Sequence, residues 1–384
     1  MQEIYFDNSS TTRCHEKAVE AMVDAYRVNY GNPSAMHMMG VRAENLVKEA
    51  RATIASTLKA KEGQILFTSG GTESNNLSLV GGALAKKRTG RHLITCAVEH
   101  AAVREPMKRL AEEGYELTVL PVDEKGMISL SDLEAALRPD TALVSLMMVN
   151  NEVGTIQPIE EAAKIIHAKG EALFHVDAIQ AYAKMAIYPG KMGIDLLSAS
   201  GHKFHGPKGV GFLYIGEKAR VIPQILGGGQ QGGLRSGTEN VPGAVGMGVA
   251  AGLAYGSLEE NRKKLYALKE QLAEGFLALP DVFLNGPEPL EGAPQILNAS
   301  FVGVRAEVLL HALEEKGIYV SAGSACSSHK KKPSGTLVAM GLPEERRESA
   351  LRFSFSVENT PEEVEEVLKA LGELLPVLRR FRRK

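Results

Sequence analysis

Several polar clusters of this sequence each follow directly after a short apolar run. They are Thr68-Ser-Gly-Gly-Thr72-Glu, Val98-Glu-His100, Asn150-Asn151-Glu, His175-Val-Asp177-Ala-Ile-Gln180 and Ser200-Gly-His202-Lys203. Taken singly, each has an ordinary interpretation, because an aspartate after a strand often caps a helix and a lone histidine is usually a hydrogen-bonded core or surface residue. Taken together, they supply an anion loop, an aspartate, a glutamine, histidines and a lysine, which is more than helix capping requires.

This set of side chains matches the needs of one cofactor. A lysine in a desolvated loop suits Schiff-base formation, a buried aspartate can keep a ring nitrogen protonated, and an imidazole can stack on the ring. A glycine-rich helix start can take a phosphate, although the first cluster alone is as consistent with a helix cap and is not a Walker loop. The set therefore predicts a site for pyridoxal 5'-phosphate.

The elements that must position these clusters are short strands alternating with amphipathic helices. The predicted strands are Gln64–Thr68, His92–Ala97, Glu116–Leu120, Ala142–Val149, Leu173–Asp177, Leu196–Ala199 and Gly211–Ile215. Helical patterns such as Ser131–Leu137 and Ile159–Ala168 lie between them, which favours an α/β fold with a mostly parallel seven-stranded sheet. Ligands of such sheets bind at the carboxyl ends of the strands, where the polar clusters fall.

The last third of the chain has a different pattern. It begins with a long helix predicted over Ser257–Leu279, and it includes a strand at Ile296–Phe301. Apolar residues spaced by three and four between Val364 and Leu378 predict a final helix with one buried face. We expect a large cofactor-binding domain over residues 15–256 and a smaller α+β domain formed by residues 1–14 and 257–384.

Composition excludes several classes of function. The 384 residues carry 44 Lys and Arg against 46 Asp and Glu, so this is not a globally basic nucleic-acid binder, and no nucleic-acid partner is expected. No run of about 18 apolar residues and no signal-like N-terminus is present, so no membrane association is expected. Three cysteines without metal-ligand spacing predict no disulfide framework, no metal and a reducing, cytoplasmic location.

One of the three cysteines lies in an unusual context. Cys326 stands in a run of Ser, Ala and Gly and is followed by His329 and Lys330–Lys332. This composition predicts an exposed loop with a thiol that nearby cations could activate. Cys96 lies in a predicted strand and is expected in the core, and Cys14 has no comparable context.

Over nearly its whole length the sequence resembles the cysteine desulfurases of the NifS/IscS type, in the class V branch of the aminotransferase-like pyridoxal-phosphate enzymes. Besides the clusters above, the resemblance rests on Tyr5-Phe-Asp-Asn-Ser-Ser-Thr-Thr, Tyr30-Gly-Asn32-Pro-Ser, Arg235-Ser-Gly-Thr238, Ser321-Ala-Gly-Ser-Ala-Cys326 and Leu351-Arg352-Phe-Ser. It implies the fold type I architecture of those enzymes.

The resemblance also implies a role for each matching residue. Lys203 matches the lysine that holds the cofactor covalently, Asp177 the partner of the pyridine nitrogen, and Gln180 the partner of the phenolic oxygen. The remaining cofactor contacts are His100 stacked on the ring, where it could also relay protons, Asn151 beside the ring, and Gly71, Thr72, Ser200 and His202 around the phosphate.

Substrate, subunit and sulfur contacts follow in the same way. Asn32 and Arg352, with Asn151 nearby, match the groups that bind the substrate, and Thr238 matches a phosphate contact from the other subunit of a homodimer. Cys326 matches the nucleophile that takes sulfur from L-cysteine as a persulfide and leaves L-alanine. The sulfur would pass to an acceptor or scaffold protein docked near the Cys326 loop, for iron–sulfur cluster or thio-cofactor assembly.

Three alternatives stay open from the sequence. A selenocysteine lyase would share the cofactor site, because its substrate differs from cysteine by one atom. A class V aminotransferase would need no loop cysteine such as Cys326. A catalytically silent scaffold would not need Lys203, Asp177 and Cys326 together.

Overall fold

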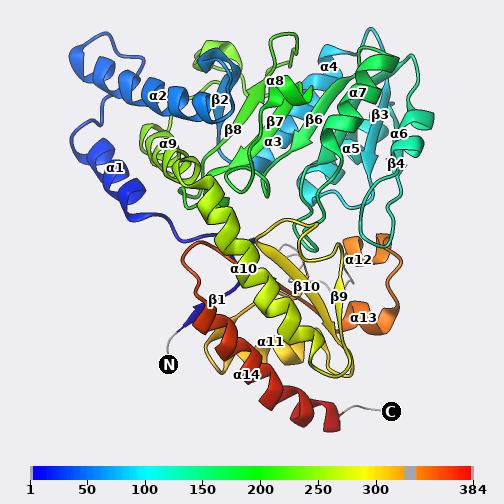
Figure 1. Cartoon of the computed structure of the whole chain (residues 1–384). Coiled ribbons are helices and arrows are strands. Elements are labelled where there is room, and N and C mark those ends of the chain that lie inside the picture. Colours follow the sequence, from blue (N-terminus) through cyan, green and yellow to red (C-terminus); the bar gives the residue numbers. More distant parts are fainter. Residues whose placement is uncertain (1–2, 324–333, 382–384) are drawn as a thin grey trace.

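The computed structural model describes residues 3–323 and 334–381 and is built around a seven-stranded sheet (Figure 1). The strands lie in the order β2-β8-β7-β6-β5-β3-β4, and β8 runs antiparallel to both of its neighbours while the other pairs are parallel. Their bounds are β2 (Ile65–Thr68), β3 (His92–Cys96), β4 (Glu116–Leu120), β5 (Thr141–Met147), β6 (Leu173–Asp177), β7 (Leu196–Ser200) and β8 (Gly211–Ile215). The predicted mostly parallel sheet of an α/β fold is confirmed.

Helices cover both faces of this sheet, and successive strand residues alternate between two apolar clusters. Leu143 and Leu196 face one cluster, and their neighbours Val144 and Leu197 face the other. The first cluster contains α5 (Ala101–Glu112), α4 (Gly82–Ala85) and the π-helical turn Leu77–Gly81 that follows α3 (Gly71–Asn76). The second contains α1 (Glu16–Arg27), α2 (Met38–Thr57), α6 (Leu130–Ala136), α7 (Ile159–Lys169) and α9 (Val241–Gly256).

A smaller antiparallel sheet with its own apolar cluster forms the rest of the chain (Figure 1). It has the order β12 (Ala350–Ser354), β10 (Ile296–Phe301), β9 (Val282–Asn285). The long helices α10 (Leu258–Leu277) and α14 (Pro361–Leu378) pack with α11 (Ala306–Glu314) on its core. The remaining described α-helices are α8 (Pro189–Met192), α12 (Gly335–Ala339) and α13 (Glu344–Glu348).

The N-terminal segment packs with this smaller part rather than with the large sheet. Strand β1 (Ile4–Tyr5) pairs in parallel with β11 (Ile318–Tyr319), and Ile4 and Phe6 lie in the small apolar cluster. Beyond Phe6 the segment runs toward the large sheet. The predicted domain boundaries, at residues 14/15 and 256/257, stay a prediction.

Among the described helices, not one is by itself both long and apolar enough to span a bilayer. Helices α9 and α10 meet that criterion only when joined, and the axis bends by 76° between them.

Phe276 offers a direct test of the small core. Its ring is fully buried and lies 5.3 Å and 4.9 Å from the ring centres of Phe301 and Phe353. Phe276→Ala should lower the free energy of unfolding by about 3–5 kcal/mol, because it leaves a cavity among these rings. The matched control on the same helix is Leu277→Ala, since Leu277 is 62% exposed. Denaturant unfolding measures both, and equal losses would contradict the packing described.

Candidate active site

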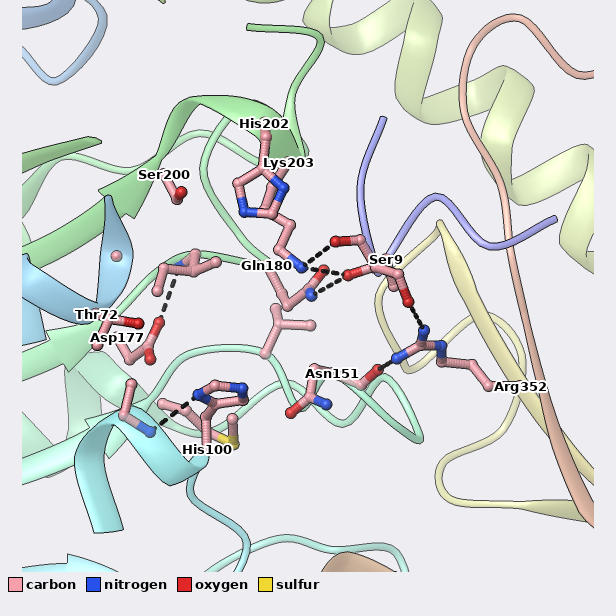
Figure 2. Close-up of a pocket in the computed structure, with 16 residues that line it drawn as sticks. Ser9, Thr72, His100, Asn151, Asp177, Gln180, Ser200, His202, Lys203 and Arg352 are labelled. Atoms are coloured by element: carbon pink, nitrogen blue, oxygen red, sulfur yellow. Dashed lines mark hydrogen bonds between the residues drawn. The ribbon is translucent and has the colours of Figure 1, made fainter. Parts of the chain in front are cut away.

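A cavity of about 240 Å³ lies at the carboxyl ends of the central strands (Figure 2). Asp177 ends β6, Ser200 ends β7, and His100 stands just beyond β3. The lining residues are Ser9, Ser10, Gly71, Thr72, His100, Ala102, Met147, Val149, Asn151, Asp177, Ile179, Gln180, Ser200, His202, Lys203 and Arg352. The expected convergence of the polar clusters at one edge of the sheet is therefore observed.

Asp177 is a buried carboxyl without a cationic side chain in direct contact among the described residues. Its Oδ1 accepts from the backbone N–H of Ile179 at 3.0 Å, and its Oδ2 accepts from Asn75 Nδ2 at 2.8 Å. Burial raises the pKa of Asp177, while these hydrogen bonds and the nearby His100 and Lys203 act in the opposite direction. A protonated ring nitrogen in the cavity would complete the environment of this carboxylate.

The local fold fixes the proton of His100. This residue caps the N-terminus of α5, where its Nδ1 accepts from the backbone N–H of Ala102 at 3.1 Å. Acceptance at Nδ1 assigns the ring proton to Nε2. Burial lowers the pKa of His100, and the positive charge of Lys203 adds to this effect against that of Asp177. The imidazole is thus held neutral beside the cavity near neutral pH (Figure 2).

Lys203 follows β7 directly, in the 3₁₀ turn Gly201–Lys203. Its Nζ donates to the carbonyl oxygens of Ser9 at 2.6 Å and Ser10 at 2.8 Å. The backbone carbonyl of Lys203 accepts from Lys184 Nζ at 3.2 Å, and burial lowers the pKa of Lys184 to about 8. The lysine is therefore held at both its amine and its backbone.

The N-terminal segment that contains Ser9 and Ser10 also forms hydrogen bonds with His202 and Gln180. His202 Nδ1 lies 3.1 Å from Thr11 Oγ1, and Gln180 Nε2 donates to the Ser9 carbonyl at 3.0 Å. Burial, followed by the charges of Lys203 and Lys208, lowers the pKa of His202 to about 4. A neutral His202 can serve as a hydrogen-bond donor beside an anion.

The start of α3 is shaped for close approach of a ligand. Gly70 has a φ of +150°, and a Cβ on Gly71 would lie 2.2 Å from Ile179 Cδ1. A larger residue at Gly71 would require the Ile179 side chain to move, and glycine leaves the backbone of the first turn bare next to Thr72 and Ser200 in the cavity wall. Backbone N–H groups at such a turn favour an anion.

Arg352 enters the cavity from the small sheet. It lies within β12, is 2% exposed, and donates from Nη1 to the Asn151 carbonyl at 2.8 Å. Its Nη2 donates to Asp7 Oδ1 at 2.6 Å and to Ser10 Oγ at 2.7 Å. Both parts of the fold therefore contribute to one cavity.

Two of the predicted site residues do not line this cavity. Asn32 and Thr238 are exposed and do not line it, and Asn32 Oδ1 instead accepts from the Ser34 N–H at 2.9 Å. Cys326, like Lys330–Lys332, lies outside the described residues. The roles assigned to the predicted site residues stay predictions.

Cys96 and Cys14 lie within the described part of the chain. Cys96 is buried, as predicted, and burial raises the pKa of its thiol well above the ordinary value. Cys14 is half-buried, and burial raises its pKa as well. Neither environment stabilises a thiolate near neutral pH.

Sequence reasoning assigned no role to Asp7, Ser9, Ser10, Asn75 or Glu99. Asn75 holds Asp177, and Glu99 Oε1 accepts from the Met147 N–H at 2.6 Å, so both support the cavity from behind. Burial, then the charge of Asp177, raises the pKa of Glu99 well above its usual range. The sequence offered one signal for Asp7, Ser9 and Ser10, which is that they belong to a polar run after the first short strand. The residues that this run contacts are far away in the sequence.

Known proteins are similar to this chain in both sequence and fold. Cysteine desulfurase IscS of Methanosarcina thermophila is 44% identical over 98% of this chain and 93% of its own length. Its counterpart in Clostridium botulinum (strain Hall) is 41% identical over 97% and 94%. A solved NifS-like protein matches with a TM-score of 0.93 and 40% identity, over 98% of this chain and 100% of that one.

A second solved structure, of SspA in complex with cysteine, has a TM-score of 0.81 and 34% identity, over 94% of this chain and 100% of that one. The aminotransferase class-V family matches residues 4–367. With nearly full coverage in each comparison, the chain belongs to the aminotransferase class-V family.

Proposed function

We propose that the protein is a pyridoxal-phosphate-dependent cysteine desulfurase, which converts L-cysteine to L-alanine and takes the sulfur as a persulfide on Cys326. The observation that carries the proposal is one cavity in which Lys203, Asp177 and His100 meet Arg352. The names of the relatives and the cysteine complex of a 34% identical structure support the choice of substrate.

The cavity fits the cofactor residue by residue. Asp177 would hold the ring N–H, Gln180 the phenolic oxygen and Lys203 the aldehyde carbon, while His100 and Asn151 would flank the ring. The phosphate would lie against Gly71, Thr72, Ser200 and His202. When bound, pyridoxal phosphate supplies an electron sink for negative charge that develops at the substrate Cα.

Residues of the chain would bind the substrate carboxylate and transfer the protons. Arg352 would bind the substrate carboxylate through its fork, and the Lys203 amine would take the Cα proton and return it. The carbonyl oxygens of Ser9 and Ser10 accept hydrogen bonds from that amine and so hold it in the cavity wall. The Nε2–H of His100 is available to donate a proton to the substrate at the Cβ–S bond that breaks.

The sulfur step is a balanced transfer. The thiolate of Cys326 attacks the substrate sulfur, a new S–S bond forms, and the substrate Cβ–S bond breaks with its electron pair left on carbon. Protonation of that carbon gives L-alanine, and the sulfur stays on Cys326 as a persulfide. We propose that an acceptor protein docks near this segment and Lys330–Lys332 to take the sulfur for iron–sulfur cluster or thio-cofactor assembly, in a reducing cytoplasm.

A homodimer is part of the proposal. Val19, Val23 and Tyr26 lie on one face of α1 at helical spacing and are 44%, 40% and 63% exposed. An exposed apolar stripe of this kind is typical of a protein interface. Thr238 is exposed in its own chain, which supports its contribution to the partner's phosphate site.

Lys203 should be the residue that bonds the cofactor. Reduction of the loaded protein with borohydride should fix the cofactor mass on the peptide that contains Lys203. Lys203→Ala should abolish this label, and the matched control Lys208→Ala, an exposed lysine five residues away, should keep it. A label that persists in Lys203→Ala would contradict the assignment.

Cys326 should carry the sulfur. Treatment with L-cysteine should add about 32 Da, one sulfur atom, to the Cys326 peptide. Cys326→Ser should keep the bound cofactor but lower alanine formation by about a hundredfold or more, because the nucleophile is lost. Cys14→Ser serves as the control and should form alanine at the wild-type rate. Unchanged turnover in Cys326→Ser would eliminate the persulfide mechanism.

The α1 stripe should hold two copies together. Light scattering should give the wild-type protein about twice the 41.3 kDa mass of the chain. Tyr26→Asp places a charge in the stripe and should shift the protein toward the monomer at micromolar concentration. Lys17→Asp, on the opposite side of α1, should leave the mass unchanged. A monomeric wild type would refute this arrangement.

A further inference from the structure

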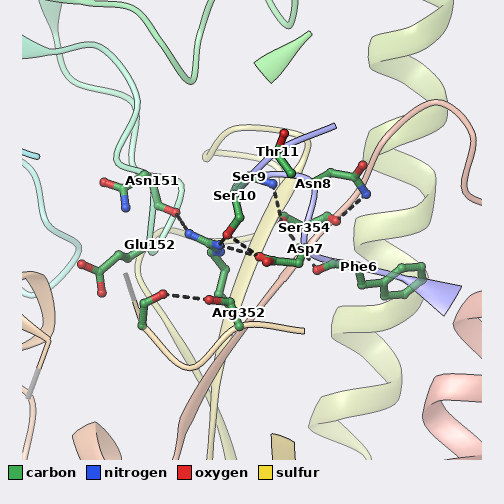
Figure 3. A network of polar contacts seen from close by, with 12 residues as sticks. Phe6, Asp7, Asn8, Ser9, Ser10, Thr11, Asn151, Glu152, Arg352 and Ser354 are labelled. Carbon is green, nitrogen blue, oxygen red and sulfur yellow. Dashed lines mark hydrogen bonds and ion pairs between the residues drawn. The ribbon is translucent and has the colours of Figure 1, made fainter. Parts of the chain in front are cut away.

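Arg352, the proposed ligand of the substrate carboxylate, already faces a carboxylate of its own chain (Figure 3). Asp7 Oδ1 lies 2.6 Å from Arg352 Nη2 and 2.8 Å from the Ser10 hydroxyl, which donates to it. The pair joins the N-terminal segment to β12, and the Arg352 side chain is 2% exposed. This pair of opposite charges, with Arg352 buried and the Asp7 side chain 20% exposed, lies beside the cavity and can influence which ligands it accepts.

Counting the guanidinium donors shows where a ligand can bind. Both N–H groups of Nη2 have acceptors, Asp7 and Ser10, and one N–H of Nη1 has the Asn151 carbonyl. Nε is buried and has no hydrogen-bond partner in the described part of the chain. A ligand carboxylate that uses two donors of the fork must therefore replace at least one existing acceptor.

The acceptor that gives way is not Asp7. Ser10 and Asn151 line the cavity, whereas Asp7 does not. Asp7 contacts the guanidinium on the side opposite Asn151 (Figure 3). The backbone around Asp7 is fixed, because Asp7 bridges to Ser354 and the Asn8 N–H donates to the Ser354 carbonyl at 3.2 Å. The hydroxyl of Ser10 can rotate away, so a ligand would replace Ser10 while Asp7 stays paired.

We infer that Asp7 is a specificity-determining residue, whose carboxylate neutralises Arg352 so that the cavity selects zwitterionic α-amino acids over carboxylates that lack an amino group. This inference rests on the proposed function, because it assumes that Arg352 receives the substrate carboxylate. A zwitterion has no net charge and keeps the hydrogen bonds of the fork. A bare carboxylate brings a net negative charge next to Asp7.

The expected size of the effect follows from Coulomb's law. We consider the charge of Asp7 and a unit charge on the ligand roughly 6 Å away. With an effective dielectric constant between about 20 and 80, their interaction changes a binding constant by about three- to a hundredfold. Lys203, Asp177 and Glu152 also lie at or near the cavity and act on both ligand classes. Because those groups stay unchanged, a ratio of two affinities isolates the contribution of Asp7.

The test compares L-alanine with propionate, which differ only by the amino group. Their dissociation constants are measured on the cofactor-loaded enzyme from the visible absorbance of the cofactor. Asp7→Asn keeps an oxygen acceptor for Arg352 and Ser10 but removes the charge. It should lower the ratio of the propionate constant to the alanine constant by at least about threefold.

Matched variants separate charge from structure. Asp7→Glu keeps the charge and Ser10→Ala removes only the hydroxyl, so both should keep the wild-type ratio. Equal weakening of both ligands in Asp7→Asn, or a lowered ratio in Asp7→Glu, would overturn the inference in favour of a structural role. If asparagine prevents folding, Asp7→Ser provides the neutral variant, and a chain that folds only with an acid at this position also counts against it.

The outcome is distinguishable from failure of the proposed function. A wild-type enzyme that forms no alanine from cysteine would refute the desulfurase activity whatever the ratio is. A fully active wild type with the same ratio in Asp7→Asn would refute only the role of Asp7.

Discussion

The segment Asp7–Thr11 is the physical link on which the cavity depends. Its carbonyl groups at Ser9 and Ser10 accept from Lys203, and its side chains at Asp7 and Ser10 accept from Arg352. Lys203 belongs to the large sheet and Arg352 to the small one. The distance between the Lys203 amine and the Arg352 guanidinium is thus set in part by this short segment, in which Asn8–Ser10 form a turn, and in part by the hydrogen bond from Arg352 to the Asn151 carbonyl.

The cavity concentrates charges that would be costly without a ligand. Asp177 is buried with hydrogen bonds from Asn75 and Ile179 but without a cationic side chain in contact among the described residues. His100 and His202 are both shifted toward their neutral forms, chiefly by burial. A cationic ring N–H and an anionic phosphate would complement these two ends, since a cation stabilises the Asp177 carboxylate and the bare N–H groups of the first turn of α3 favour an anion.

The sequence predicted the strands well because of burial. Strands buried on both faces are mostly apolar runs, and six of the seven strands are buried along nearly their whole length, the edge strand β4 being the exception. Each of the seven predicted strands lies within about two residues of its observed bounds. The carboxyl-end rule then placed Asp177, Ser200 and Lys203 together. The sequence did not predict the roles of Asp7 and Ser9, because their partners lie 345 and 194 residues away. The periodicity of apolar residues does not indicate which loop crosses the edge of a sheet. Asn32 and Thr238 remain outside the cavity of a single chain.

Residues beside the cavity also anchor the described flanks of the segment that contains Cys326. At one end, Ser321 pairs with Arg352 through two backbone hydrogen bonds of 3.1 Å and 2.8 Å. At the other, Ser334 donates to the carboxylate of Glu152, the residue next to Asn151. Arg352 in turn donates to the Asn151 carbonyl. The described residues on either side of the cysteine segment are therefore anchored to Arg352 and to Glu152, next to Asn151, so hydrogen bonds around the proposed carboxylate-binding residues also fix where that segment leaves and rejoins the described fold.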